Sequence, residues 1–354
     1  MKKILLIALI FIFAMSLMAC NQESGEKTEE TVEPGEAVEE STETLAEEET
    51  EKAIVEEQIK VRVAGLNGPT SIGMIKLFED YTNPKKNVEI TYTNASAPDQ
   101  LVGKLIQGEL DFAAVPTNLA AIIYNKTDGA YQLTNVNTLN VIYILTNGVE
   151  IDSIKDLKGK TVHISGKGAT PDYMMKYLLN ANGLVVDEDV ILDFSLDHAS
   201  LAQALSAGDV EIAVLPQPFV TTVKMNNPDV NVAVDLLDEW EAVAGDALFA
   251  MGGLVVRTEF AKEHPEIVKA FLDMYDEGVA YVNKNPKAAS LLVEKYGVLP
   301  KAKIAELAIP LSNIVYMDAY EYKDAINEYY QILFDFNKAS IGGELPDDEF
   351  YYRK

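Results

Sequence analysis

Two stretches of the chain resemble each other at a constant offset of 100 residues. Residues 101–118 read LVGKLIQGELDFAAVPTN, and residues 201–218 read LAQALSAGDVEIAVLPQP. Each has helically spaced apolar residues, a glycine where a helix would end, an apolar run typical of a buried parallel strand, and a proline that stops it. Upstream, residues 61–70 align with 161–170. Solenoid repeats have shorter periods, about 20–50 residues. The repeat predicts two similar α/β halves facing each other; alternatively, any two βα units share such a pattern.

Turn-forming residues divide the chain into the expected strands and helices. In the first half we expect strands at 61–64, 88–92 and 110–115, helices at 71–81 and 119–124, and one long strand at 132–145 that crosses between the halves. In the second half we expect strands at 161–165, 190–194, 210–215 and 230–236, a helix at 172–181, and a returning strand at 247–257. The remainder is expected to be helical, at 258–263, from His264 onward, and at 287–296, 302–308 and 319–336.

Local signals mark where several helices begin and end. Gly108 lies where a C-cap glycine belongs, and Ser96 with Asp99 resembles a capping box. Thr170 is a suitable N-cap before Pro171, which favours the first helical turn. These signals place polar loop residues at helix N-termini.

The first 20 residues form an expected lipoprotein signal peptide. Lys2 and Lys3 precede an uncharged apolar run, which is short for a membrane span. The sequence Leu-Met-Ala-Cys at 17–20 resembles the bacterial lipobox. That resemblance implies cleavage before Cys20 and attachment of fatty acyl chains to it, and two or more chains anchor a protein stably. The alternative is an ordinary secretory signal with an incidental cysteine. We expect a lipid-anchored protein on the extracytoplasmic face of the cell membrane.

Charge is distributed unevenly and limits the possible partners. Residues 21–58 contain 15 Glu and two Lys and almost no aromatic or long apolar residues, which predicts a disordered acidic tether. The net charge of the whole chain is −27, so nucleic acid is an unexpected partner. Only three arginines occur, at 62, 257 and 353, which disfavours a guanidinium clamp on an anion.

Metal chemistry also lacks support in the sequence. Cys20 is the single cysteine, so neither an intramolecular disulfide nor a thiolate cluster can form. The three histidines, at 163, 198 and 264, have no recognisable ligand spacing. We expect no metal and no cofactor.

Five local sequences, in order, resemble one family. They are AVPTN at 114–118, DLKGKTV at 156–162, GATPDY at 168–173, LPQPF at 215–219 and FAKEHPEIVKAFL at 260–272. Through them residues 59–354 resemble solute-binding proteins of ABC importers, in the branch of nitrate, sulfonate, taurine and thiamine-precursor binders. The resemblance implies a two-lobed periplasmic-binding-protein-like (type II) α/β fold with a helical C-terminal part. The implied lobes are residues 59–145 with 246–354 (lobe I) and 146–245 (lobe II), closing on a ligand at the hinge. It also implies an ABC permease as partner, and we expect a monomer.

Ligands of open α/β sheets bind beyond the carboxyl ends of strands, near helix N-termini. This rule selects polar residues after the expected strands as candidate ligand contacts. The candidates are Asn67, Gly68, Thr70, Ser71, Ser96, Asp99, Thr117, Asn118, Asn137, Thr138, Gly168, Thr170, His198 and Gln217. Tyr143, Tyr173 and Phe219 are possible stacking faces. Several candidates, including Asn67, Thr70 and Thr170, are equally suited to a turn or cap role.

The amide-rich set of candidate contacts favours a neutral heteroaromatic or vitamin-like solute. A sulfonate-like anion remains the alternative, because helix N-termini can bind anions. The alternative function is an enzyme on the same fold, acting in thiamine-pyrimidine or menaquinone-precursor synthesis. Such chemistry needs a positioned base or a Schiff-base lysine, for which only His198 and Lys167 are candidates. A third class, an adhesin, would show repeats or exposed apolar patterns that the sequence lacks. We therefore expect a binding protein without catalytic residues.

Overall fold

The computed structural model describes residues 58–81 and 88–354. The expected signal peptide, the lipid attachment at Cys20 and nearly all of the acidic tether lie outside the described residues. Along the described ranges, none of the helices combines enough length with enough apolar character to cross a membrane.

The first sheet has six strands in the order β11-β4-β10-β3-β1-β2. Their bounds are β1 Ile59–Leu66, β2 Val88–Ala95, β3 Phe112–Pro116, β4 Tyr131–Thr138, β10 Gly252–Arg257 and β11 Ile314–Asp318. Strand β1 pairs in parallel with β2 and β3, whereas β10 runs antiparallel to both β3 and β4. The strand β3 is buried along its whole length, as its apolar sequence predicts for a central strand.

The second sheet has five strands in the order β7-β6-β8-β5-β9. Their bounds are β5 Ile142–Thr146, β6 Thr161–Ile164, β7 Ile191–Asp193, β8 Ile212–Pro216 and β9 Asn231–Asp235. Strand β6 is parallel to β7 and β8, and β5 is antiparallel to both β8 and β9.

The two sheets share one plan. The order β2-β1-β3-β10-β4 corresponds strand by strand to β7-β6-β8-β5-β9. In each order the fourth strand, β10 or β5, is antiparallel to its neighbours. The chain reaches each of these strands directly from the other sheet: β5 follows β4 of the first sheet, and β10 follows β9 of the second sheet and a helix. The repeat found in the sequence appears here as β3 and β8, which begin at residues 112 and 212. The prediction of two similar α/β halves agrees with this arrangement.

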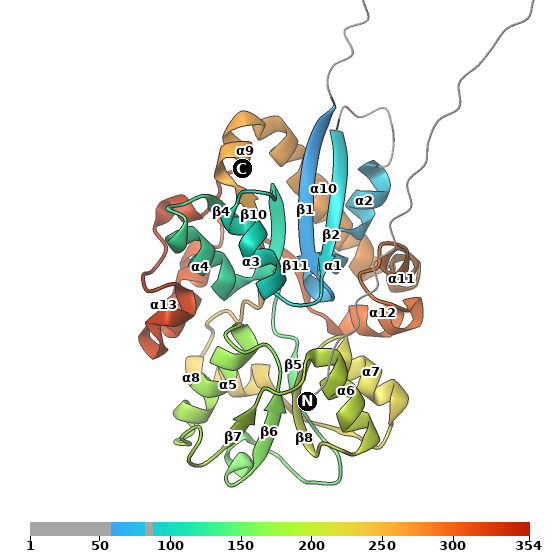
Figure 1. Ribbon diagram of the computed structural model, residues 1–354, viewed down its shortest axis with the longest axis vertical. Helices are drawn as coiled ribbons and strands as arrows, with labels where there is room; N and C mark the ends of the chain where they lie inside the picture. The colour runs from blue at the N-terminus through green and yellow to red at the C-terminus, as the bar shows by residue number, and fades with distance from the viewer. Residues whose placement is uncertain (1–57, 82–87) are drawn as a thin grey trace, which may run out of the picture. The chain divides into compact units, whose positions relative to one another are not determined.

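Helices surround both sheets. Around the first sheet lie α1 Pro69–Ile72, α2 Ile75–Tyr81, α3 Asp99–Ile106, α4 Thr117–Lys126, α9 Thr258–Glu263, α10 Pro265–Lys284, α11 Pro286–Lys295, α12 Ala302–Ala308 and α13 Lys323–Phe336, in the upper part of Figure 1. Around the second sheet, in its lower part, lie α5 Thr170–Ala181, α6 His198–Ala207, α7 Phe219–Asn226 and α8 Leu236–Ala244. Short 3-10 turns complete the chain at Ile154–Leu157, Ile309–Leu311, Lys338–Ile341 and Asp348–Phe350.

Helix α10 shows how the apolar pattern becomes packing. Its residues at helical spacing are buried as expected, among them Phe271 and Tyr275. The ring of Phe271 stacks on the ring of Phe112 in β3, with centroids 4.0 Å apart and an interplanar angle of 7°. This contact attaches the C-terminal helices to the middle of the first sheet.

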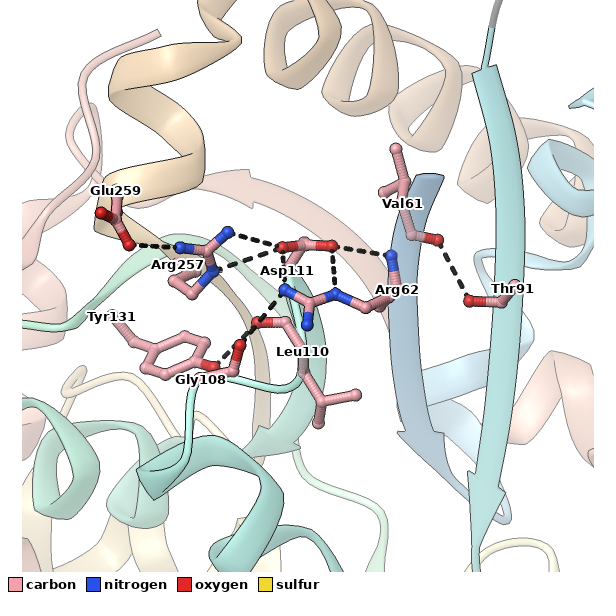
Figure 2. A network of polar contacts seen from close by, with 9 residues as sticks. All are labelled: Val61, Arg62, Thr91, Gly108, Leu110, Asp111, Tyr131, Arg257 and Glu259. Carbon is pink, nitrogen blue, oxygen red and sulfur yellow. Dashed lines mark hydrogen bonds and ion pairs between the residues drawn. The ribbon is translucent and has the colours of Figure 1, made fainter. Parts of the chain in front are cut away.

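A buried ion-pair network holds the start of β3 (Figure 2). Asp111 is 1% exposed and accepts hydrogen bonds from the backbone N–H, Nε and Nη2 of Arg62. It also accepts bonds from Nε and Nη2 of Arg257, whose Nη1 donates to Glu259. Burial alone would raise the pKa of Asp111, but these hydrogen bonds lower it below its ordinary value. Two of the three arginines therefore have a structural role.

Three expectations about elements are wrong. The single helix expected at 71–81 is two helices, α1 and α2, with a turn at Gly73 and Met74 in which the Met74 N–H donates to the Ser71 carbonyl. The long strand expected at 132–145 is β4 and β5, one in each sheet. At the break, Asn140 Oδ1 accepts the N–H of Ile142, which removes this group from the ladder. The C-terminal remainder, expected to be helical, contributes the strand β11.

Two capping expectations are also wrong. The partner of Ser96 is Gln100, since Gln100 Oε1 accepts from the Ser96 N–H and its Nε2 donates to the Ser96 hydroxyl. Thr170 is the first residue of α5, and Ala169 takes the N-cap position. Gly108, by contrast, follows the C-cap residue Gln107 of α3 and has φ 68°, as expected for a helix-terminating glycine.

Candidate functional site

A cavity lies where the carboxyl ends of strands from both sheets meet. It encloses about 110 Å³. Apolar cavities of roughly 150 Å³ hold a benzene ring, so this one suits a compact molecule. Its lining comprises Leu66, Asn67, Pro69, Thr70, Ser96, Pro98, Pro116, Thr138, Val141, Gly166, Ala169, Thr170, Pro171, His198, Pro216, Gln217, Phe219 and Met251. Among these residues none is Asp, Glu, Lys or Arg.

The sheet topology explains why these residues meet. In the first sheet β1 ends at Leu66 and β3 at Pro116. In the second sheet β8 ends at Pro216. Because parallel strands place their carboxyl ends at one edge of a sheet, the loops after them converge there. Each loop leads into a helix, so free backbone N–H groups also lie near this edge.

Seven of the predicted contacts line the cavity. They are Asn67, Thr70, Ser96, Thr138, Thr170, His198 and Gln217. Of the expected stacking faces, Phe219 lines it too, whereas Tyr143 lines a neighbouring groove with Val232 and Leu307, and Tyr173 lines neither. The role of these residues as ligand contacts stays a prediction.

The other seven predicted residues lie outside the lining. Asp99 is exposed at the start of α3, and Ser71 is fully buried in α1. Thr117 donates to the Ala250 carbonyl, and Asn137 donates to the Thr70 carbonyl, so both support the lining from behind. The remaining three, Gly68, Asn118 and Gly168, lie where the two sheets' loops contact each other.

Asn118 connects three parts of the chain. From α4, its Nδ2 donates to the carbonyl of Gly168 at 3.3 Å and to that of Ser340 at 3.2 Å. Its Oδ1 accepts from the Thr170 hydroxyl at 3.1 Å. Asn118 is fully buried, so breaking these bonds would leave polar groups unsatisfied. The residue therefore bridges the first-sheet and second-sheet halves beside the cavity.

His198 presents a neutral imidazole to the cavity. Its Nδ1 is hydrogen-bonded to the Ser165 hydroxyl, and its ring stacks on Phe219 with centroids 5.1 Å apart. Burial lowers the pKa of His198 to about 4, and the neighbouring carboxylate of Asp197 opposes this only weakly. The ring is therefore uncharged at neutral pH, in keeping with the uncharged lining.

Sequence reasoning missed the apolar part of the lining. Five prolines, at 69, 98, 116, 171 and 216, contribute to it, together with Leu66, Val141 and Met251. The prolines carried a usable signal, because each stands at a strand end or in a first helical turn, where the cavity edge lies. Within the described ranges, no group of three or more His, Cys, Asp or Glu side chains could hold a metal ion.

Comparison with solved structures defines the class of the fold. An ABC transporter structure from Parabacteroides distasonis matches with TM-score 0.68 and 24% identity, covering 84% of this chain and 99% of that one. The periplasmic aliphatic sulphonate binding protein SsuA of Escherichia coli matches with TM-score 0.66 and 17% identity over 83% and 92% of the chains. The nitrate-binding protein NrtA of Synechocystis matches with TM-score 0.57 and 13% identity over 83% and 91%. The protein has the two-lobed periplasmic-binding-protein fold, as expected.

The family follows from the sequence comparison. The family model described as NMT1/THI5 like matches residues 85–289, so the chain belongs to the NMT1/THI5-like family. A curated "putative binding protein" of Brucella abortus (strain 2308) is 21% identical over 213 residues, 60% of this chain. The match spans about 62% of the length of that relative.

Proposed function

We propose that the protein is a lipid-anchored, extracytoplasmic solute-binding protein that captures a small molecule between its two lobes and delivers it to an ABC importer permease. The observation that carries the proposal is the cavity, to which both sheets contribute polar side chains: Asn67 and Thr70 from one, His198 and Gln217 from the other. The proposed lobes are residues 59–145 with 246–354, and residues 146–245.

Capture then works through closure of the lobes. A solute can drive closure only by binding the closed form more tightly than the open one. Contacts from both lobes provide this difference, because a solute in the open form reaches only one set of them. The bonds of Asn118 to Gly168 and Thr170 add to the stability of the closed form.

The uncharged lining favours a neutral, compact solute of the heteroaromatic or vitamin-like kind. An anion in this cavity would have no cationic side chain of the lining beside it, and an unpaired buried charge is costly. The alternative is a sulfonate-like anion held by backbone N–H groups, for which the N-termini of α5 and α6 lie close by. The sulphonate and nitrate binders among the structural neighbours support this alternative.

Native mass spectrometry of the purified protein, followed by denaturation and identification of what is released, tests the proposed function. A stoichiometric small molecule would support a binding protein and identify its class of solute. A chemically altered product would instead favour the enzyme alternative. An empty protein that also binds nothing from a broad panel of sulfonates, pyrimidines and vitamins would contradict the proposal.

The lipid anchor makes a separate prediction. Replacing Cys20→Ser removes the thiol that would carry the diacylglycerol, so the variant should move from the membrane to the soluble fraction. Fractionation of cells followed by immunoblotting measures this. The matched control is Ser16→Ala, inside the expected signal peptide, which should stay with the membrane. Membrane association of the Cys20→Ser variant equal to the wild type would contradict the anchor.

A further inference from the structure

The orientation of the Gln217 side-chain amide is fixed by its own neighbours. Gln217 directly precedes Pro218 and α7, and its Oε1 accepts from the N–H of Thr221 at 3.3 Å and from the Thr221 hydroxyl at 2.8 Å. A backbone N–H can only donate, so the oxygen must face Thr221. The Nε2 group has no hydrogen-bond partner among the described residues, and Gln217 lines both the cavity and the neighbouring groove of Tyr143. The free group that Gln217 can offer a solute is therefore an N–H donor.

The same logic fixes Asn67. Asn94 Nδ2 donates to the carbonyl of Gly297 at 2.7 Å, which identifies that end of Asn94 as the nitrogen. The same Nδ2 donates to Asn67 Oδ1. The amide oxygen of Asn67 is therefore occupied, and its Nδ2 has no partner within the described part of the chain. Asn67 is an exposed residue of the cavity lining, and the free group that it can offer is likewise an N–H donor.

These two amides come from opposite lobes and from loops that approach closely. A Cβ placed on Gly68, next to Asn67, would lie 3.5 Å from Pro218 Cδ and 3.9 Å from the Gln217 carbonyl oxygen. The Oγ1 of Thr70, three residues after Asn67, is buried and has no partner among the described residues. A buried hydroxyl without a partner is costly, and Thr70 lines the cavity, so a solute can satisfy it.

We infer that Asn67 and Gln217 form a two-sided amide clamp, which grips a hydrogen-bond-accepting group of the solute, such as a ring carbonyl, with one N–H donor from each lobe. The inference rests on the proposed function and narrows its solute class. The solute carries an exposed acceptor and no positive charge, because the clamp offers no amide oxygen to a cation. Closure brings the second donor to the acceptor, so the clamp also links recognition to lobe closure.

Three compact probes distinguish acceptors from donors: 2-pyridone, a neutral ring with a carbonyl; methanesulfonate, an anion with oxygen acceptors; and benzamidine, a planar cation with donors only. Calorimetric titration should show 2-pyridone binding and no benzamidine binding. In Gln217→Glu an oxygen replaces the donating nitrogen, and 2-pyridone should bind about tenfold more weakly or worse. Benzamidine should then bind. Methanesulfonate should lose affinity in this variant as well.

Asn67→Asp is the second variant, on the other lobe, and should weaken 2-pyridone binding similarly. The matched control is Gln132→Glu, which makes the same chemical change at an amide that donates to Glu349 outside the cavity. It should leave affinity unchanged. Circular dichroism verifies that each variant is folded, and either cavity variant alone suffices for the test.

The outcomes separate this inference from the proposed function. Unchanged 2-pyridone affinity in both cavity variants, or wild-type preference for benzamidine, would overturn the clamp. A wild type that holds another solute stoichiometrically but neither acceptor probe would also overturn it while the proposed function stands. Failure to hold any solute by native mass spectrometry and titration would overturn both.

Discussion

At the scale of single residues, Asp111 joins two arginines that are distant in sequence. The carboxylate is buried, so removing it leaves Arg62 and Arg257 without their main partner (Figure 2). We expect Asp111→Ala to lower the free energy of unfolding by about 3 kcal/mol, the lower end of the range for breaking a buried pair, since Arg62 is partly exposed. Denaturant titration measures this.

The matched control is Asp273→Ala, which removes an exposed carboxylate paired with Lys269 and Lys354. Exposed pairs contribute little, so the loss should stay below about 1 kcal/mol. Equal losses in the two variants would show that the Asp111 network does not stabilise the sheet beyond an ordinary surface pair.

His198 gives a pH prediction. Its pKa is about 4 in the folded protein against 6.5 ordinarily, so the unfolded chain binds the proton more readily. The stabilising effect of the neutral ring is complete above pH 6.5 and is lost as the pH falls towards 4. The groups around the ring are Ser165, Asp197 and Phe219.

The free energy of unfolding should change between pH 6.5 and pH 4 by about 2 kcal/mol less in His198→Gln than in the wild type. This value is discounted for solvent screening, because the ring lines a cavity that admits solvent. Chemical denaturation of both proteins across this pH range measures it. The carboxylates of the chain titrate in both proteins, so the difference between the two pH profiles isolates the effect of His198. Identical pH profiles would rule out the lowered pKa.

At the scale of elements, the stacking of α10 on β3 allows a packing prediction. Phe271 is 1% exposed and contacts Phe112, so Phe271→Ala leaves a cavity in the core of the first lobe. The expected loss of unfolding free energy is about 3–5 kcal/mol. Leu291→Ala on α11, where the side chain is 62% exposed, is the control and should change stability by less than about 0.5 kcal/mol. Thermal and denaturant unfolding measure both, and similar small losses would contradict this packing.

The sequence predicted helices and strands correctly where local patterns define them, and failed where contacts with residues far away in sequence define them. The buried run of β3 and the apolar spacing of α10 were both readable. The split between β4 and β5 was not, because it depends on Asn140, whose carbonyl accepts from Asn313 Nδ2 173 residues away. Strand β11 was missed because it pairs with the edge of β4, a partner far away in sequence.

At the scale of the whole molecule, Asn118 should control closure. Asn118→Ala removes the bonds to Gly168 and Thr170, so the population should shift towards an open form. We expect a larger radius of gyration by small-angle X-ray scattering and about tenfold weaker solute binding.

Asn125→Ala is the matched control, because this amide on the same helix donates to the Ile341 and Glu344 carbonyls, which lie outside the second sheet. It should change stability without changing the radius of gyration. If the two variants scattered alike, Asn118 would be a structural residue only.

The sequence by itself determined the two-half α/β plan, the strand ends rich in polar residues and the family, because apolar periodicity, glycine stops and short motifs are local properties. It also proposed fourteen candidate residues that include the seven polar residues of the cavity lining, since strand ends and helix starts are readable along the chain. Only the tertiary structure decided which of the fourteen candidates face one cavity, that Asn118 bridges the halves, and which atoms of Asn67 and Gln217 remain free. These outcomes depend on hydrogen bonds between residues far apart in sequence, such as Asn94 with Gly297, and no local pattern encodes such pairs.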